Sequence, residues 1–477
     1  MKKWLKNPGI YTNVLYILTA FYLGYHLIEL QVLKSKYIFL VILGIVVVGI
    51  ALLFLAFAKN IKRIVRAIGS SFAVFLSIVF LIGGCGVSLV NSFIDDITAP
   101  EVEYKDISLV ALKESKIQVV EDLKAEDKIG YQTICYPKGA EKMFKALKED
   151  KGMENPKHEF GTINEMVKGL YEETVPVIIL DEAYRNVIED EYPSFTNDTR
   201  VLYTINYPEE EIKLVQDGDI TKDSFVVLIS GIDTYGKISD VSRSDVNILA
   251  VVNPVQAKIL LISIPRDYYV PIVNVEDGKK SEKERMDKLT HTGLFGPKCT
   301  METLKKVFDV PIDYYVRVNF TSVIDIVDAI GGINVKSDYA FDDFRVGMNK
   351  CDGHRALSFA RERYAFVDGD RQRGKNQMRV IEAIVKKLSN PKWDYDYLQL
   401  FKAVGDCIET NIPNKDIKKL IRFQINDMPK WSIETTSVNG TDGQDYSYYG
   451  GEVLYVMYPE PASVDAAKEK IRSVCFD

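Results

Sequence analysis

The chain has few of the residues that build metal and redox centres. Its 477 residues include six cysteines and four histidines, and no two cysteines form a CxxC pair. Zinc sites and thiol redox motifs need closely spaced ligands, so the sequence supports neither kind of centre. A single disulfide, such as one between Cys299 and Cys351, stays open, because disulfides form outside the cell.

A surplus of positive charge is also missing. The 60 lysines and arginines are outnumbered by 67 aspartates and glutamates, which gives a formal net charge of -7. General binding of nucleic acid needs a broad basic face, so this composition argues against nucleic acid as a partner. A local cluster of cations can still bind one particular phosphate. The densest cluster lies in residues 356–377 and contains Arg361, Arg363, Arg371, Arg373 and Lys375.

Long apolar runs are present, and all of them lie near the N-terminus. They are Ile10–Val32, Tyr37–Ala58 and Ile68–Phe93. Each is long enough for the roughly 20 helical residues that cross a bilayer. A buried core helix or a cleaved signal peptide fits three successive runs poorly. We therefore predict that residues 1–96 form a region of three transmembrane helices.

The positions of lysine and arginine predict the orientation of these spans. Basic residues gather before the first run and between the second and third, whereas the loop after the first run has few. They are Lys2, Lys3 and Lys6; then Lys34 and Lys36; then Lys59, Lys62, Arg63 and Arg66. The positive-inside rule places the N-terminus in the cytoplasm and everything after Phe93 outside. The sequence thus predicts a multi-pass protein of the cell membrane with a large extracellular part. A DNA-binding regulator is disfavoured, because only short loops would face the cytoplasm.

The extracellular part is long enough for two domains. Residues 97–217 alternate strand and helix patterns, which predicts a small accessory α/β domain without a catalytic constellation. Its expected strands are residues 107–112, 129–136, 175–180 and 200–207, and its expected helices are residues 140–149 and 164–173.

Residues 218–477 are predicted to form the larger domain. Three nearly continuous apolar strands, FVVLISG, VNILAVVN and KILLISI, are typical of a sheet buried between helices. Residues 321–332 and 377–388 show helical spacing. The expected fold is a three-layer α/β/α domain.

Charged residues adjoin the ends of these strands, where ligands collect in such folds. A strand in LSFARER would also place Arg361 and Arg363 on one face. Arginine binds phosphate oxygens in bidentate fashion, and paired carboxylates with phosphate oxygens hold magnesium. The pattern indicates a phosphate or pyrophosphate site with a divalent metal, although ion pairing within each segment remains the alternative. The residues beside the three strands are Asp233, Arg243, Asp245, Arg266 and Asp267.

An ordered series of motifs between about residues 225 and 387 resembles the LytR–CpsA–Psr family. The three spans and the additional extracellular unit resemble its CpsA branch, which is linked to capsule or exopolysaccharide. The motifs are GIDTYG, SRSDVNILAVVN, KILLISIPRDYYV, DKLTHTGLFG, DYYVRVNF, IVDAIGGINV, DGHRALSFARER and GDRQRGKNQ.

The resemblance implies an enzyme that attaches a glycopolymer to peptidoglycan. The donor would be the polymer on a polyprenyl pyrophosphate lipid, and the acceptor a wall sugar hydroxyl, that of N-acetylmuramic acid O6. Asp233 and Asp245 would hold Mg2+, or Mn2+, and would act in catalysis with Arg266. Other capsule-assembly proteins are further expected partners. The resemblance assigns the pyrophosphate site to Arg243, Arg266, Lys288, Arg361, Arg363, Asp370, Arg373 and Gln377.

Some positions depart from the family pattern. Thr290 and Thr292 leave the role of their loop open, and Asn376 stands where an arginine is usual, which removes one pyrophosphate contact. Arg371 and Lys375 fall outside the usual basic positions, which predicts a solvated rim or contacts to an anionic polymer. Two other functions use the same residues: hydrolysis of the pyrophosphate lipid, and non-enzymatic binding of lipid-linked polymer that regulates capsule synthesis.

Overall fold

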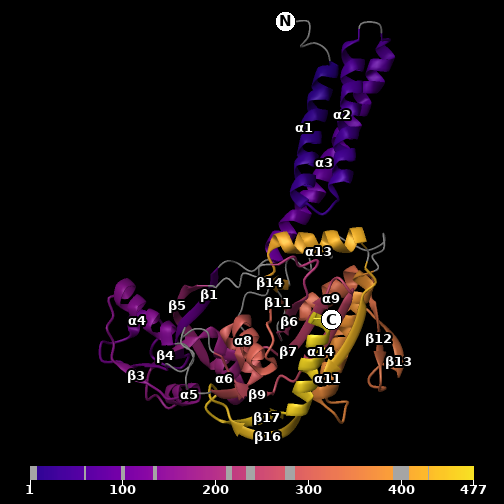
Figure 1. The fold of residues 1–477 in the computed structure, drawn as a ribbon. Coiled ribbons are helices and arrows are strands. Elements are labelled where there is room, and N and C mark those ends of the chain that lie inside the picture. The colour runs from indigo at the N-terminus through magenta and orange to yellow at the C-terminus, as the bar shows by residue number, and fades with distance from the viewer. Residues whose placement is uncertain are drawn as a thin grey trace.

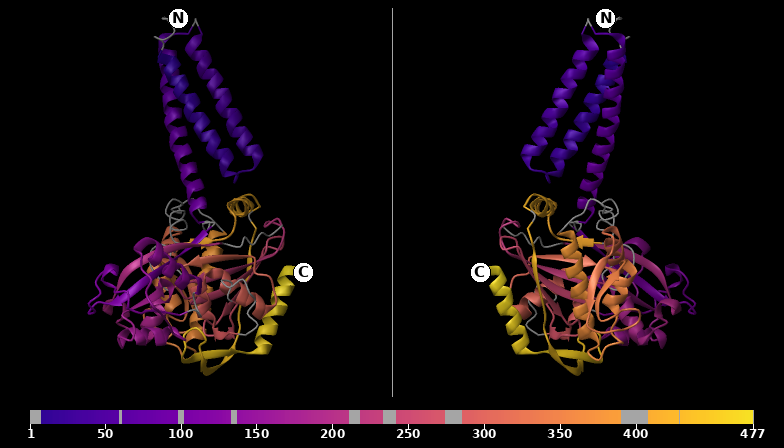
Figure 2. Two further views of the ribbon diagram at one scale, coloured as in Figure 1. Left: turned by 90° about the vertical axis from the view of Figure 1, so that its left-hand side faces the viewer. Right: turned by 90° about the vertical axis from the view of Figure 1, so that its right-hand side faces the viewer.

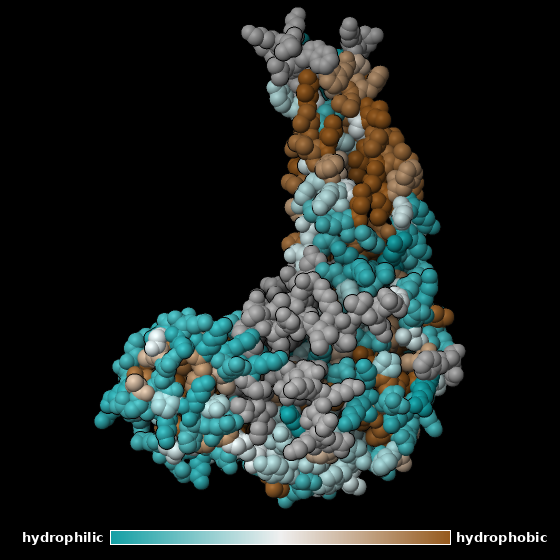
Figure 3. Space-filling model, turned by 60° about the vertical axis from the view of Figure 1, so that its left-hand side comes forward, coloured by the Kyte–Doolittle hydropathy of each residue, from teal (hydrophilic) through white to brown (hydrophobic). Residues whose placement is uncertain are grey.

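The computed structural model describes residues 8–58, 61–97, 102–132, 137–210, 218–232, 242–273, 285–389, 408–427 and 429–476. Three long helices form a stalk above a globular part (Figures 1 and 2). All three are long and apolar enough to cross a membrane, as the sequence predicts. Hydrophobic surface gathers on the stalk, whereas the globular part is mainly hydrophilic (Figure 3). The stalk helices are α1 (Pro8–Leu30), α2 (Ser35–Phe57) and α3 (Arg63–Ile97).

The stalk meets the globular part at helix α13 (Asn414–Asp427), which lies crosswise below it in Figure 1. The turn between α1 and α2 supplies the contacts. The Lys34 ammonium lies 3.7 Å from the Asp427 carboxylate, and the Asn426 amide nitrogen lies 3.5 Å from the Val32 carbonyl oxygen. Helix α3 also contacts α13. The α13 side of the globular part therefore faces the spans.

A five-stranded sheet of order β3-β2-β4-β1-β5 forms the accessory unit. All five residues of β4 are buried, in keeping with its apolar sequence. The predicted helices and three of the predicted strands are present, whereas the strand expected at 129–136 is limited to three residues, and residues 133–136 lie outside the described ranges. The elements are β1 (Val102–Leu112), β2 (Ile129–Tyr131), α4 (Pro137–Lys151), β3 (Lys157–Glu159), α5 (Ile163–Tyr171), β4 (Val177–Asp181), α6 (Arg185–Glu191), α7 (Phe195–Asp198) and β5 (Thr199–Glu210).

The accessory unit packs firmly on the larger domain. The Tyr184 ring meets the Phe295 ring edge-on at 6.1 Å, and the Phe295 ring lies 4.7 Å from that of Tyr449. Buried residues of both sheets belong to one continuous hydrophobic cluster. The boundary proposed at residue 217 stays a prediction.

The larger domain is built on a six-stranded sheet of order β14-β11-β6-β7-β8-β15. Strands β6, β7 and β8 form an antiparallel meander, while β11 runs parallel to β6 and β15 runs parallel to β8. The carboxyl ends of β6, β8, β11 and β15 therefore meet the start of β7 at one end of the sheet. The strands are β6 (Phe225–Gly231), β7 (Val246–Asn253), β8 (Lys258–Ile264), β11 (Tyr314–Val318), β14 (Ile408–Thr410) and β15 (Ser432–Ser437).

Helices cover both faces of this sheet, so the predicted three-layer α/β/α fold is confirmed. Helices α8 (Pro297–Phe308) and α14 (Pro461–Phe476) pack on one face, where Leu228 and Leu260 are fully buried. Helices α11 (Asp370–Leu388) and α13 pack on the other. Outside the layers lie β9 (Tyr269–Pro271), β10 (Met286–Lys288), the 3-10 helix η4 (Leu289–Phe295), α9 (Phe320–Ala329), and the hairpins β12 (Ile333–Ser337) with β13 (Gly347–Cys351) and β16 (Gly440–Tyr446) with β17 (Val453–Pro459).

The strand predicted in LSFARER is wrong, because this segment belongs to helix α10 (Gly353–Arg361). The Asp352 side chain caps the helix by accepting a hydrogen bond from the Arg355 N–H at 2.9 Å. Ala356, Phe359 and Ala360 are buried at the three- and four-residue spacing of a helix. The helix ends at Arg361, and the extended backbone beyond it carries Arg363.

The disulfide left open between Cys299 and Cys351 is absent. Neither cysteine takes part in a disulfide, and both are fully buried. Cys299 lies in the cluster between the sheet and α8, whereas Cys351 lies in a separate cluster beside α10.

Candidate active site

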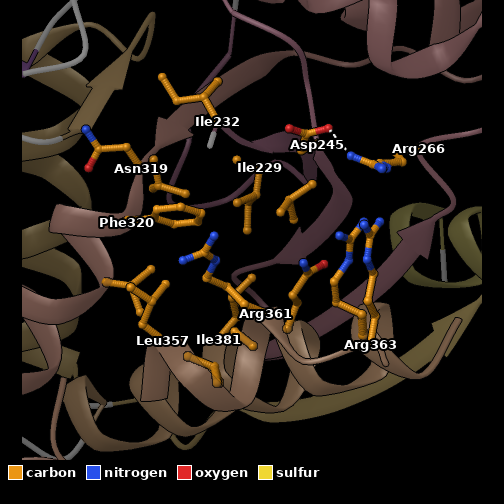
Figure 4. Close-up of a pocket in the computed structure, with 18 of the residues that line it drawn as sticks. Ile229, Ile232, Asp245, Arg266, Asn319, Phe320, Leu357, Arg361, Arg363 and Ile381 are labelled. Carbon is orange, nitrogen blue, oxygen red and sulfur yellow. Dashed lines mark hydrogen bonds and ion pairs between the residues drawn. The ribbon is translucent and has the colours of Figure 1, made fainter. Parts of the chain in front are cut away.

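Six of the predicted site residues line one cavity at the sheet end described above. The cavity has a volume of about 300 Å³. Asp245 precedes β7, Arg266 follows β8, and the others lie at the end of α10 and the beginning of α11, as Figure 4 shows for the labelled ones. Asp233 lies outside the described residues. The six are Asp245, Arg266, Arg361, Arg363, Arg373 and Gln377.

The remaining walls of this cavity, which we call the apolar cavity, are mostly hydrophobic. They come from the sheet and from α9, α10 and α11, so the chamber lies between the end of the sheet and these three helices. We call the four arginines of this cavity, Arg266, Arg361, Arg363 and Arg373, the arginine wall. A site with such a wall and an apolar interior fits an amphiphile whose anionic head is attached to a hydrocarbon chain. The hydrophobic side chains are Ile229, Ile232, Val246, Val318, Phe320, Val323, Leu357, Ala360, Val380 and Ile381.

A series of alternating charges underlies the arginine wall. Arg266 Nη1 donates to Asp245 Oδ1 at 2.7 Å, and Arg266 Nε lies 3.8 Å from the Asp267 carboxylate. Lys288 pairs with the other side of Asp267. The predicted ligand Lys288 is therefore engaged behind Arg266 and does not line the cavity. Its charge offsets Asp267, which leaves the wall net positive toward a ligand.

Thr290 joins the two segments that carry Asp245 and Arg266. Its hydroxyl donates to Asp245 Oδ1 at 3.1 Å, and its N–H donates to the Arg266 carbonyl oxygen at 2.8 Å. Its own carbonyl oxygen accepts from the Ser244 N–H at 3.0 Å. A Cβ on Gly293 would lie 2.4 Å from Ser244 N, so only glycine allows this close packing. Sequence reasoning left this loop without a role, because the hydrogen bonds join residues that are distant in the chain.

His291 serves this loop from the side away from the cavity. Its Nδ1 lies 2.8 Å from Asp287 Oδ1, and both side chains are buried. Asp287 also accepts from the Ser447 hydroxyl and from the N–H groups of Tyr449 and Lys288. Burial opposes charge on Asp287, but His291 and these backbone N–H groups hold the pKa of the carboxyl below its usual value. The geometry thus gives His291 a structural hydrogen bond.

Replacing Asp287 with asparagine is expected to lower the free energy of unfolding by about 3 kcal/mol, because it breaks a buried charged network. The lowered pKa predicts a pH signature as well. Stabilisation by the carboxylate is fully present above its unfolded-state pKa of about 3.9 and is lost as the pH falls toward the lower folded-state pKa. Thermal unfolding of both proteins between pH 3 and pH 7 measures this. A difference in stability between the two proteins that does not narrow below about pH 4 would contradict the lowered pKa of Asp287.

The guanidinium of Arg361 lies over the Phe320 ring, 4.1 Å from its centroid. This cation–π contact holds the charge at the boundary between arginine wall and apolar interior. Figure 4 shows Arg363 reaching toward the Asp245–Arg266 pair from the same side. Although LSFARER is not a strand, both arginines still line the cavity, because the helix ends at Arg361 and the chain continues along the cavity to Arg363.

A second cavity of about 190 Å³ adjoins the first and shares Asp245, Arg266, Arg373 and Gln377 with it. Its other walls are mainly polar, so we call it the polar cavity. Arg371 and Lys375, expected as a rim or as contacts to an anionic polymer, both line it. The further lining residues are Asn247, Ser263, Ile264, Pro265, Asp368, Gly374, Ser437, Val438 and Asn439.

Three other predicted positions lie differently. Arg243 is half-buried beside Ser244 and lines neither cavity. Asp370 is the first residue of α11, and its side chain is outside the described part. Asn376, which replaces the usual arginine, is buried and donates to the Phe359 carbonyl oxygen at 3.2 Å. This last contact ties α11 to α10, and Asn376 lines neither cavity.

Comparison with known proteins supports the family resemblance that the sequence motifs indicate. A teichoic acid–peptidoglycan transferase, TagU of Enterococcus faecalis, is 36% identical over 206 residues, which cover 42% of this chain and 65% of that protein, just under two thirds. TagT of Bacillus subtilis, named for the same transfer, is 32% identical over 257 residues, or 50% of this chain and 76% of that protein. The crystal structure of B. subtilis TagT matches 55% of this chain and 94% of its own, with 27% identity and a TM-score of 0.41.

The match to a family model is broader than any of these. Residues 194–468, more than half of the chain, match the model of the LytR_cpsA_psr family. The match begins within the segment assigned to the accessory unit and runs through the whole six-stranded sheet into α14. It includes every residue of both cavities. The chain belongs to the LytR–CpsA–Psr family.

Proposed function

We propose that this chain is a membrane-anchored ligase that transfers a glycopolymer from polyprenyl pyrophosphate to a sugar hydroxyl of peptidoglycan. The observation that carries the proposal is the joining of an arginine wall to an apolar chamber in one cavity. A polyprenyl pyrophosphate has both matching parts, a dianionic head and a long hydrocarbon tail. The names of TagU and TagT, which describe transfer of teichoic acid from a polyisoprenyl carrier to peptidoglycan, support the same reaction class.

The polymer we propose is a capsular polysaccharide or exopolysaccharide. Three spans and the five-stranded accessory sheet support this choice, because they resemble the CpsA branch of the family. We further propose that the globular part lies outside the cell, since the lysines and arginines beside the spans favour this orientation. Protease added to intact cells without a cell wall would then degrade the globular part and spare the spans. Protection of the globular part would contradict the orientation.

The proposed reaction is a displacement at the polymer-side phosphorus. The acceptor hydroxyl oxygen forms a bond to this phosphorus, the bond to the bridging oxygen breaks, and polyprenyl phosphate leaves. Arg266, Arg361, Arg363 and Arg373 neutralise the charge of the pyrophosphate and of the leaving phosphate. The proton of the hydroxyl passes to a carboxylate at the arginine wall, for which Asp245 is the described candidate.

A divalent cation, Mg2+ or Mn2+, fits the same place. Asp245 Oδ1 accepts from Arg266 and Thr290, and no described residue donates a hydrogen bond to its Oδ2. Magnesium is often held by one or two carboxylates together with phosphate oxygens. We propose Asp245, with Asp233, as its protein ligands. The ion would lower the negative charge of the pyrophosphate when the donor is bound.

An assay with defined substrates tests the proposal. Purified full-length protein in detergent is given a polyprenyl-pyrophosphate oligosaccharide, uncrosslinked peptidoglycan oligosaccharides and Mg2+. Mass spectrometry is expected to detect a phosphodiester between the two glycans, which EDTA abolishes and Mg2+ restores. Free phosphorylated oligosaccharide alone would identify a hydrolase, and donor binding without either product would identify a regulator. A phosphodiester that forms undiminished in EDTA would refute only the metal.

A further inference from the structure

We propose that the polar cavity is the binding site for the acceptor sugar, and that the two substrates approach the shared arginine wall from opposite sides. This inference rests on the proposed function, because it needs two substrates. It assigns a role to polar residues that line the second cavity alone, among them Lys375, Asn439 and Arg371. None of these three lines the apolar cavity.

The first argument is geometric. In phosphoryl transfer the attacking and leaving oxygens lie roughly in line through phosphorus. The leaving oxygen belongs to the polyprenyl phosphate, whose hydrocarbon tail occupies the apolar cavity, so this oxygen lies toward that cavity. The attacking hydroxyl must then come from the other side of the phosphate. Asp245, Arg266, Arg373 and Gln377 line both cavities, so a phosphate bound to them faces the apolar cavity on one side and the polar cavity on the other.

The second argument is chemical. The polar cavity is lined by Ser263, Ser437 and Asn439, whose hydroxyl and amide groups suit the hydroxyl and acetamido groups of a sugar. A hydrocarbon tail would leave these groups without hydrogen-bond partners, which is costly. Tail and sugar are thereby directed to different cavities.

The third argument is electrostatic. Peptidoglycan glycans carry peptide stems with free carboxylates, so the acceptor is anionic. Lys375, half-buried at the polar cavity, has no ion pair within the described residues. Arg371 is held beside it by hydrogen bonds to the Gly440 carbonyl oxygen at 2.8 Å and to the Asp442 carboxylate at 3.3 Å. The four cations that line the polar cavity outnumber its two carboxylates, those of Asp245 and Asp368, so the cavity favours such an acceptor over a neutral glycan.

The base of the cavity is set by a close approach of α11 to the sheet. A Cβ on Gly374 would lie 2.6 Å from Ser263 Oγ, so the glycine lets the helix come down onto β8. The helix thereby places Arg373 at the shared wall and Lys375 at the polar cavity within one turn. Donor and acceptor sides are in this way fixed by one rigid element.

The test separates the Michaelis constants of the two substrates in the transfer assay. Lys375→Glu and Asn439→Ala are compared with Lys386→Glu, a charge reversal on the same helix at an exposed position beside Glu382. Both polar-cavity variants are expected to raise the KM for peptidoglycan oligosaccharide about tenfold, which corresponds to about 1.4 kcal/mol. The KM for the lipid-linked donor should stay within twofold, and water should replace the acceptor more often, so that the share of hydrolysed donor rises. The control should match the wild type.

Two results would overturn the inference. A raised KM for the donor with an unchanged acceptor KM would show that the polar cavity holds the donor's sugars. Unchanged constants in both variants, with normal thermal unfolding, would show that the cavity binds neither substrate. Failure of the wild-type protein to form a phosphodiester would instead refute the proposed function, so the two failures are distinct.

Discussion

Replacing Arg266 with alanine is expected to reduce the rate of polymer transfer about a thousandfold. Arg266 lines both cavities, and its side chain is only 23% exposed, so its charge is weakly screened. Removing one preorganised donor from a site of developing negative charge costs about two to three orders of magnitude in rate. The loss also leaves Asp245 without its 2.7 Å partner, so an uncompensated carboxylate would face the pyrophosphate. We therefore expect the upper end of that range.

Two further variants make this result interpretable. Arg266→Lys keeps the charge but loses the planar, bidentate guanidinium, so its activity should fall between that of Arg266→Ala and that of the wild type. Arg379→Ala removes an arginine of α11 that pairs with Asp338 and lines neither cavity. This control should retain transfer. If Arg266→Ala keeps more than a tenth of the wild-type rate while folding normally, the arginine wall is not the pyrophosphate site.

Replacing Ala360 with phenylalanine is expected to weaken binding of long-chain donors about a hundredfold. Ala360 lies on α10 and is one of the small side chains facing the apolar cavity. A phenyl ring there would occupy space that the hydrocarbon tail needs. Excluding three or four buried methylene groups costs about 2–3 kcal/mol, which is about two orders of magnitude in affinity. A donor analogue with a single isoprene unit should lose far less.

The dependence on chain length is the control within this experiment, since overpacking of α10 would harm both donors alike. Ala383→Phe, on the neighbouring α11 in partly buried surroundings, introduces the same ring without facing either cavity. It should leave donor binding unchanged. Equal affinity of Ala360→Phe for long and short donors would mean that the tail binds elsewhere.

The sequence predicts those parts of the molecule that depend on local pattern. Three apolar runs of sufficient length are three long helices, and FVVLISG, VNILAVVN and KILLISI are buried strands. The polar residues after β8 and before β7 share one end of the sheet, because the antiparallel meander reverses direction at each turn. Asp245 and Arg266 could therefore be placed together before any coordinates were known.

Other features depend on packing between distant segments. LSFARER fits the alternation of a strand as well as the spacing of a helix, and its burial against α9 and α11 decides for the helix. The role of Thr290 needs η4 to rest on two separate loops. The polar cavity needs β15, more than 160 residues after β8, to pair with it in parallel and bring Ser437 and Asn439 beside Ser263. None of these pairings leaves a local signal in the sequence.

The central claim is that one site binds a polyprenyl pyrophosphate through its arginine wall and its apolar cavity together. Native mass spectrometry of the full-length protein in detergent, saturated with a long-chain polyprenyl pyrophosphate, tests it most directly. The wild type is expected to carry one bound lipid, and Arg266→Ala and Ala360→Phe to carry far less, while Arg379→Ala matches the wild type. An unliganded wild type, or equal occupancy in all four proteins, would contradict the account.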